Sequence, residues 1–147
     1  MQNHGGWDDR PGIGVLRSDD HGHSWSSISE GLPTDFGFPI LVHPHSVDTV
    51  YVIPLEPMTR TCPDGRPAVW RSENGGKSWK ALRKGFPKRQ SYFTVLRDAM
   101  DADDLKSPGI YLGTTTGQLW LGHDGGEEWT CLFDSLPPIN CVKVAAV

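Results

Sequence analysis

Hydrophobic and polar residues alternate over short segments of this chain, which is typical of β-strands. Residues 38–43 form an apolar run, and residues 49–54 are rich in β-branched and aromatic side chains. The 17 glycines and 12 prolines interrupt the chain at short intervals, which favours turns between many short strands. The best helical candidate, residues 97–106, is rich in aspartate and ends in the turn Ser107-Pro108-Gly109. We therefore predict an all-β protein.

The predicted strands fall into similar sets along the chain. Two sets have four members and one has only two, so the N-terminal set is incomplete. The C-terminal residues, Asn140 to Val147, read as an apolar strand without a partner. In chain order, the predicted strands of the three sets are 14–17 and 25–28; 38–43, 49–54, 68–72 and 78–82; and 92–97, 109–114, 118–121 and 128–133.

A short polar pattern, Ser-x-Asp-x-Gly-x-Ser-Trp, separates the last two strands of each set. It occurs within residues 17–25, 71–79 and 121–129, so that the tryptophans are 54 and 50 residues apart. An apolar-Pro pair follows each tryptophan by seven residues. Self-similarity at this period indicates a repeat architecture, in which each repeat is one supersecondary unit that packs on its neighbours.

Each residue type in the pattern suits a tight hairpin turn. The aspartate can accept hydrogen bonds from backbone N–H groups of its own turn, the glycine adopts a positive φ without steric cost, and the serines can tie the two sides together. The tryptophan is expected to be buried between sheets. Asn74 keeps the acceptor in the second copy, but Gly122 and Glu128 replace the serines of the third, whose turn should be less well tied. The expected structural residues are Ser18, Asp20, Gly22, Ser24 and Trp25; Ser72, Asn74, Gly76, Ser78 and Trp79; and Asp124, Gly126 and Trp129.

These copies resemble Asp-box repeats, also called bacterial neuraminidase repeats, of sialidase-like β-propellers. Their wider context is similar to the C-terminal part of bacterial propellers loosely described as glycosyl hydrolases. The resemblance implies four-stranded antiparallel propeller blades, with the Asp-box between the third and fourth strands on the rim away from the substrate face, as a structural motif. The segments that carry the wider resemblance are Gly31-Leu32-Pro33, His43-Pro44-His45, Asp48 to Val52, Val95 to Asp98 and Gly113 to Gly117.

The number of expected blades bears on how the protein assembles. We divide the chain into an incomplete blade (1–33), two blades (34–87 and 88–138) and a closing strand (139–147), about three blade-equivalents of a single partial propeller. So few blades cannot close a ring and would expose wide apolar faces. Either the chain is part of a longer propeller, or two copies join head-to-tail, each giving Asn140 to Val147 to the other's first blade. We favour the homodimer, which satisfies both edges at once.

The charge, the apolar runs and the cysteine count of the chain limit which partners and cofactors we expect. The formal net charge is −4, from 14 basic and 18 acidic residues, and no stripe of Lys or Arg indicates a nucleic-acid partner. No apolar run is long enough for a membrane helix. Cys62, Cys131 and Cys141 are an odd number without metal-ligand spacing, so we expect reduced thiols, no metal and no cofactor. Without a signal peptide the chain is expected to be cytoplasmic, or secreted or periplasmic if a signal peptide or N-terminal half has been removed.

Candidate binding residues lie in the loops and on the first strand expected of each blade. Loops of the length of 55–67 without structure of their own are often functional. Arginines suit anionic or carboxylate-bearing ligands through bidentate contacts, and a carbohydrate is a further possible ligand. The candidates are Trp7, Asp8, Arg10, Glu56, Arg60, Arg66, Arg97 and Asp98.

The sequence leaves two function classes open. One is a non-enzymatic propeller that binds a ligand or a protein. The alternative is a glycoside hydrolase, sialidase-like or xyloglucan-cleaving. A retaining sialidase needs three arginines, a tyrosine nucleophile with a glutamate partner and an aspartate acid, whereas a general glycosidase needs two carboxylates flanking the scissile bond. Asp8, Asp9, Asp35, Glu56 and Asp64 could supply such a pair. We favour the non-enzymatic class, because the Arg-Ile-Pro signature of sialidases and other catalytic signatures are absent and a fold does not by itself supply a function.

Overall fold

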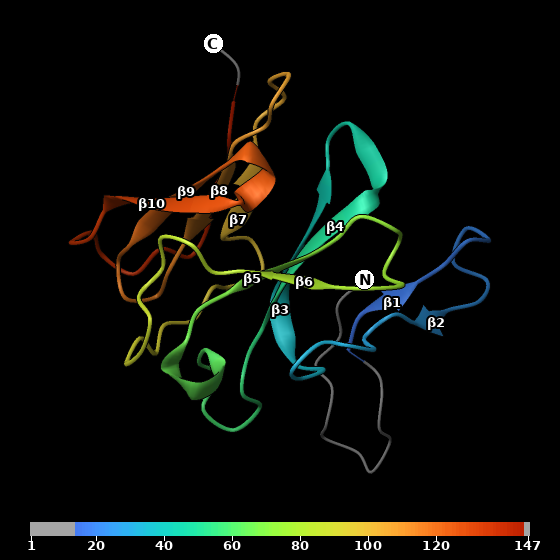
Figure 1. Cartoon of the computed structure of the whole chain (residues 1–147), viewed down its shortest axis with the longest axis horizontal. Coiled ribbons are helices and arrows are strands. Elements are labelled where there is room, and N and C mark those ends of the chain that lie inside the picture. The colour runs from blue at the N-terminus through green and yellow to red at the C-terminus, as the bar shows by residue number, and fades with distance from the viewer. Residues whose placement is uncertain (1–13, 146–147) are drawn as a thin grey trace.

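Antiparallel pairing between strands adjacent in sequence builds each of the three described sheets. The computed structural model describes residues 14–145. Strands make up 36% of the described residues and helices 5%, so the described part of the protein is all-β as predicted. Figure 1 shows the three sheets following one another across the molecule. The first sheet pairs β1 (Leu16–Arg17) with β2 (Ser26–Ser27); the second contains β3 (Gly37–His43), β4 (Ser46–Pro54), β5 (Val69–Ser72) and β6 (Lys80–Leu82); and the third contains β7 (Met100–Ala102), β8 (Ile110–Gly113), β9 (Leu119–His123) and β10 (Glu128–Phe133).

One predicted strand is wrong. The third sheet begins at β7, not within residues 92–97, where the structure has no strand. Phe93 and Val95 are buried there, so the alternation that indicated a strand reflects burial of an unpaired segment. Its backbone bonds to loops instead: the Cys62 thiol donates to the Phe93 carbonyl, and Thr115 N–H donates to the Thr94 carbonyl at 2.9 Å.

The main core lies between the two four-stranded sheets. The first strands of these sheets, β3 and β7, contact each other. Aromatic rings fill the outer part of the interface, where Phe86 stacks on Trp129 with ring centroids 4.9 Å apart and also contacts Trp120 at 4.9 Å. Tyr51 from β4 and Leu112 from β8 are essentially inaccessible. Because burial of apolar area is the main favourable term in folding, this interface is the chief source of stability.

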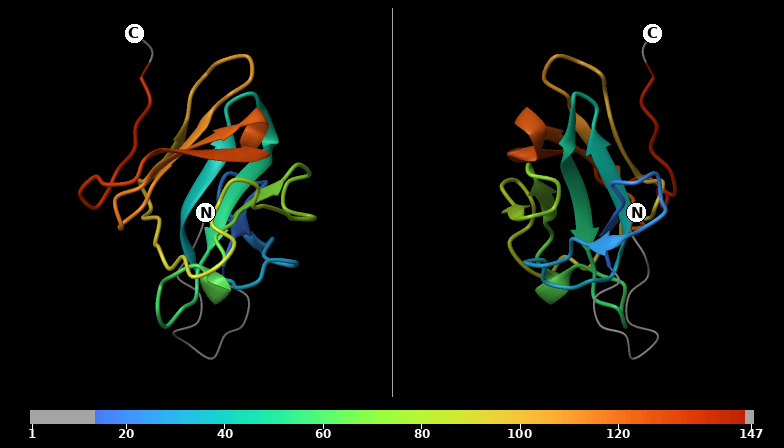
Figure 2. Two further views of the ribbon diagram at one scale, coloured as in Figure 1. Left: turned by 60° about the vertical axis from the view of Figure 1, so that its left-hand side comes forward. Right: turned by 90° about the vertical axis from the view of Figure 1, so that its right-hand side faces the viewer.

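The C-terminal segment runs beside the third sheet of its own chain. Cys141 forms a parallel bridge with Asp98, and Val142 N–H donates to the Asp98 carbonyl at 2.9 Å. The Ile139 side chain packs so closely on Gly113 that a Cβ there would collide with it. In both views of Figure 2 the segment lies at one side of the molecule, outside the sheets. The described part of the predicted closing strand is therefore not without a partner.

Serine and aspartate side chains hold the first repeated turn, between β1 and β2. Ser18 Oγ donates to Asp20 at 2.8 Å and accepts the Gly22 N–H at 2.7 Å. Asp20 also accepts the backbone N–H of Ser24 at 2.8 Å and its hydroxyl at 2.6 Å. Gly22 has φ +90°, a conformation that only glycine adopts readily. The contacts are those expected from the residue types.

The second turn repeats this network, whereas the third does not. Asn74 accepts the Ser78 N–H at 3.0 Å and donates its amide to the Ser78 hydroxyl at 2.8 Å, so asparagine replaces aspartate without losing the pattern. In the third turn a 3₁₀ turn, η2 (Asp124–Gly126), stands in place of the serine network. Among the described residues, the Asp124 side chain makes no hydrogen bond to its own turn.

The expectation that all three tryptophans are largely buried is wrong for Trp25. Trp129 is 2% exposed, Trp79 is half-buried, and Trp25 is 48% exposed. Trp79 and Trp129 are covered because each contacts a residue of the preceding unit. Trp79 Nε1 donates to the Ile28 carbonyl of the first unit at 2.8 Å, and Trp129 stacks on Phe86 of the second. No described unit precedes Trp25, so its ring lacks this cover.

The first turn should make stability depend on pH in acid. Hydrogen bonds from Ser24, then from Ser18, lower the pKa of Asp20 to about 2. A carboxyl whose pKa is depressed on folding contributes stability that is present above its unfolded pKa and is lost as pH falls through its folded pKa. We expect the wild-type melting temperature to fall as pH drops from about 4 to about 2.

An asparagine variant separates charge from hydrogen bonding at this position. Asp20→Asn should keep most of the turn, as Asn74 does in the second copy, and should reduce the acid dependence. Asp20→Ala should lower the melting temperature at pH 7 as well, because it leaves turn N–H groups without an acceptor. Circular dichroism melts from pH 2 to 7 test this. Equal melting temperatures for Asp20→Ala and wild type at pH 7 would contradict the role assigned to Asp20.

Candidate functional site

The long loop between β4 and β5 is folded back on itself and on the segment before β7. Glu56 N–H donates to the Thr61 carbonyl at 2.8 Å, and Arg60 N–H donates to the Glu56 carbonyl at 2.7 Å. The loop ends in a 3₁₀ turn, η1 (Pro63–Gly65), whose Gly65 carbonyl accepts the Ser91 N–H at 3.0 Å. The loop is therefore positioned by its backbone, which leaves its charged side chains at the surface.

The structure does not gather the predicted binding residues into one site. Arg60 and Arg66 are exposed, and Glu56 is half-buried. Arg97 and Asp98 lie outside any strand, contrary to prediction, and the backbone of Asp98 pairs with the C-terminal segment. Of the described candidates, Arg66 lines a pocket, together with residues of the connection that follows β6. Trp7, Asp8 and Arg10 lie outside the described residues.

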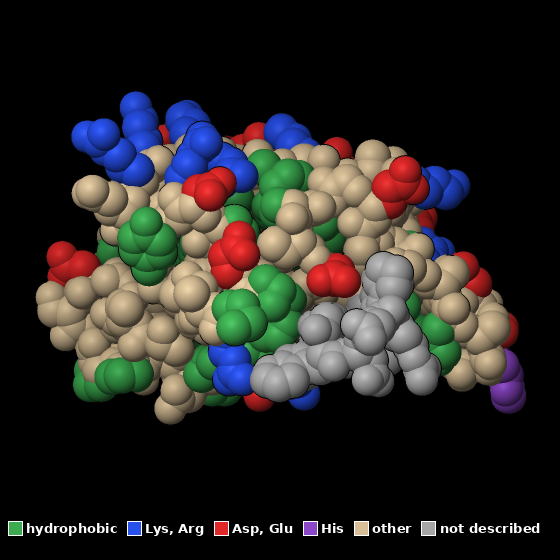
Figure 3. Space-filling view, turned by 90° about the horizontal axis from the view of Figure 1, so that it is seen from below, with side chains coloured by type: hydrophobic (Ala, Val, Ile, Leu, Met, Phe, Trp, Pro, Cys, Tyr) green, Lys and Arg blue, Asp and Glu red, His purple; other side chains and the backbone are tan. Residues whose placement is uncertain are grey.

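A basic pocket of about 260 Å³ lies where this loop meets the connection that follows β6. No acidic residue lines it. Figure 3 shows Lys and Arg side chains gathering at one edge of the molecule. We call this the basic pocket; its walls are Arg66, Pro67, Arg83, Lys84, Phe86, Pro87 and Lys88.

The sequence prediction missed three of the four cations of the basic pocket. Arg83, Lys84, Lys88 and the neighbouring Arg89 fall within seven residues, a local density of positive charge that is a visible signal. A short, bent connection can place several charged side chains close together, as a long loop can.

A second polar cluster lies between the two four-stranded sheets, on the side of the repeated turns. Arg71 of β5 is its centre, with a side chain only 9% exposed. It donates to the Gly125 carbonyl at 3.0 Å and to Glu127 at 2.7 Å. Burial raises the pKa of the nearby Tyr51 hydroxyl. The cluster joins the sheets through charge-assisted hydrogen bonds.

Histidines border the same cluster. Burial, followed by the positive charge of His45 and Arg71, lowers the pKa of His43. The His45 ring bonds to the Leu105 carbonyl at 2.9 Å and lies 3.5 Å from the Asp104 carboxylate. These contacts cross from the β3–β4 turn to the loop before β8. Together with Arg71 they form a structural clasp between sheets.

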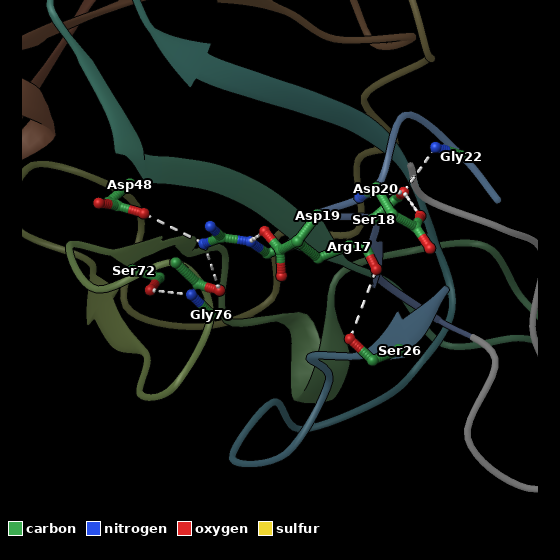
Figure 4. Close-up of polar contacts among 10 residues, drawn as sticks. Arg17, Ser18, Asp19, Asp20, Gly22, Ser26, Asp48, Ser72 and Gly76 are labelled. Carbon is green, nitrogen blue, oxygen red and sulfur yellow. Dashed lines mark hydrogen bonds and ion pairs between the residues drawn. The ribbon is translucent and has the colours of Figure 1, made fainter. Parts of the chain in front are cut away.

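The contact made by Arg71 has a counterpart one unit earlier. Arg17 occupies the same position in the first copy of the repeated pattern and donates to the Gly75 carbonyl of the second turn at 3.3 Å. Figure 4 shows its side chain lying between Asp48 and the second turn; the distance to the Asp48 carboxylate is 3.1 Å. The third copy has Leu121 at this position. The arginine of one unit therefore reaches the turn glycine of the next unit, twice and in the same direction.

Apolar side chains also contact the turn of the next unit, as Arg17 and Arg71 do. The residue three positions after the tryptophan in one unit lies against the turn glycine of the next unit. Ile28 lies so close to Gly76 that a Cβ there would collide with it, and Leu82 lies 3.1 Å from the position of a Cβ on Gly126. The third member of this series, Leu132, is 42% exposed. The Leu132 side chain of the last unit therefore has no turn glycine of a following described unit to pack on.

Cys62 is the buried cysteine of the described part of the chain. Burial raises the pKa of the Cys62 thiol to about 12, so it is not a nucleophile at neutral pH. Residues 14–145 contain no group of three or more His, Cys, Asp or Glu side chains placed to hold a metal ion. Nor does this part of the chain contain a helix that is long and apolar enough to cross a membrane.

Comparison with known proteins does not change this picture. The chain matches no model of a protein family and no curated protein sequence. The function must therefore be inferred from the geometry described above.

Proposed function

We propose that this chain is a non-enzymatic interaction module, a run of Asp-box β-propeller blades whose ring is completed by a second copy of the chain. The observation that carries the proposal is the contact between consecutive units, which is made twice in one direction. Arg17 and Arg71 donate to the turn glycines of the following units. A contact that repeats with the same polarity generates an array with unlike ends.

The two ends of the array carry complementary halves of this contact. At the first unit, Trp25 is 48% exposed, and nothing from another unit lies within 4 Å of a Cβ built on Gly22. At the last unit, Leu132 is 42% exposed although Ile28 and Leu82, its counterparts, pack on glycines of the next turn. Docking Leu132 of one copy on Gly22 of another would repeat the internal contact and cover Trp25.

Apolar surface beside the first sheet supports the same proposal. A groove of about 320 Å³ runs between β1–β2 and the face of β3–β4. Its exposed apolar lining includes Trp25, Val42 and Val47, which are 48, 51 and 84% exposed. Contiguous apolar surface on a soluble protein commonly marks an interaction site. A second copy is the occupant that the repeated contact favours.

A matched pair of variants tests this interface. Leu132→Asp should convert the assembly to single chains, because a carboxylate would be buried against the turn of the next copy without a partner. Met58→Asp places the same charge on a residue that is 94% exposed and lies at neither end, and it should leave the assembly unchanged. Sedimentation velocity gives the mass of each variant. An assembly that survives Leu132→Asp in a folded protein would contradict the proposal.

A further inference from the structure

The basic pocket holds an arginine that is already fixed in position. The Arg83 guanidinium lies 5.9 Å from the centroid of the Trp70 ring, and its Nη1 donates to the Arg66 carbonyl at 2.8 Å and the Pro67 carbonyl at 3.4 Å. Its Nε and Nη2 atoms have no hydrogen-bond partner among the described residues. One edge of the guanidinium is thus anchored, and the other edge is available as a pair of donors.

The positive charge around Arg83 is only partly neutralised. Lys84 forms an ion pair with Glu128 at 2.8 Å, but Arg66 and Lys88 take part in no ion pair within residues 14–145. Burial and then the charge of Arg66 lower the pKa of Arg83, and this outweighs the opposite effects of Cys62 and Asp64. Like charges held together in this way are stabilised by a bound anion.

The remaining walls of the basic pocket are apolar. Pro67, Phe86 and Pro87 complete the lining around a volume of about 260 Å³. That space holds about eight or nine water molecules at the density of liquid water, which exceeds the size of a free phosphate or sulfate ion. An anionic group at Arg83 therefore leaves room for a carbon skeleton against the proline and phenylalanine side chains.

We propose that the basic pocket binds an oxyanion, phosphate or sulfate, carried as a monoester on a small organic ligand. Arg83 provides the two-donor edge that matches two oxygens of the group. Arg66 and Lys88 add positive charge at the walls of the pocket, and the apolar walls contact the carbon skeleton. This proposal is independent of the assembly proposed above, since it uses no residue of the contact between copies.

Titration calorimetry of the full chain with three probes tests the ligand class. Glucose 6-phosphate, glucose 6-sulfate and glucose share a skeleton and differ in the anionic group. We expect saturable binding of one or both esters at one site per chain and no binding of glucose. Stronger binding of one ester identifies the group. If neither ester binds with a dissociation constant of about 10 mM or tighter, the proposal is overturned.

Three variants locate the site. Arg83→Lys keeps the charge but removes the two-donor edge, and we expect affinity to fall about tenfold. Lys88→Gln changes an exposed residue without hydrogen bonds to other described residues, so it should fold normally and lower the affinity about threefold. Arg89→Gln is the control, because Arg89 is the next residue in sequence but does not line the pocket. We expect its affinity to match wild type.

Two outcomes would contradict this assignment. If Arg89→Gln weakens binding as much as Lys88→Gln, the ester responds to general surface charge and not to the pocket. If a short single-stranded oligonucleotide competes with the esters and binds more tightly with a steep dependence on salt, the surface is a polyanion contact instead. Neither result depends on whether the chain forms a dimer.

Discussion

Gly85→Ala should be among the most destabilising single substitutions in this protein. Gly85 follows β6 with φ +96°, and a Cβ there would collide with the backbone carbonyl of Trp129 in the third sheet. A positive φ costs a residue with a side chain about 1–2 kcal/mol, and overpacking against backbone that cannot move adds about 1–3 kcal/mol. We expect a loss of about 2–5 kcal/mol in the free energy of unfolding.

Gly31 offers a control at the same position of the first repeat. It has φ +89°, but nothing lies within 4 Å of a Cβ built on it. Gly31→Ala therefore carries the backbone strain without the collision. Urea denaturation followed by circular dichroism compares the two variants. Equal destabilisation would mean that the collision with the Trp129 carbonyl adds nothing to the cost of the backbone strain.

Arg71→Ala should also be strongly destabilising. The substitution removes the bonds to the Gly125 carbonyl and to Glu127 and leaves space beside the buried Tyr51. Breaking a buried ion pair by removing one partner typically costs about 3–5 kcal/mol. Since Glu127 is 43% exposed and retains Lys80, we expect a smaller loss, about 2–4 kcal/mol.

Arg17→Ala is the matched comparison for Arg71→Ala. Arg17 makes the equivalent glycine contact, but its side chain is 38% exposed and its ion pairs with Asp19 and Asp48 are at the surface. Surface ion pairs contribute little, so this variant should lie much closer to wild type. Thermal and urea unfolding measure both. A wild-type stability for Arg71→Ala would contradict the role of Arg71 as a clasp between sheets.

Local chemistry made much of the fold predictable. The turn of residues 18–24 needs an acceptor, a positive φ and two hydroxyls, and the sequence displays each of them. Strands β4 and β8 were visible because β-branched and aromatic residues concentrate there. Residues 92–97 misled the prediction because apolar alternation reports burial, and burial does not require a strand partner.

The candidate site was harder to predict, because no local sequence motif shows which distant residues come together in the fold. Arg66 and Arg83 are 17 residues apart in sequence and meet because Arg66 precedes β5 and Arg83 follows β6, its antiparallel partner. The exposure of Trp25 shows the same limit. The residue is identical to its counterparts, and only the position of its unit at one end of the described array distinguishes it.

The mass of the full chain in solution tests the central claim most directly. Light scattering coupled to size exclusion, run over a hundredfold range of concentration, measures it without a ligand or a label. The head-to-tail contact through Leu132 and Trp25 predicts twice the mass of one chain, with Trp25 protected from quenchers of its fluorescence. A stable single chain over the whole range, with Trp25 accessible, would contradict the proposed assembly.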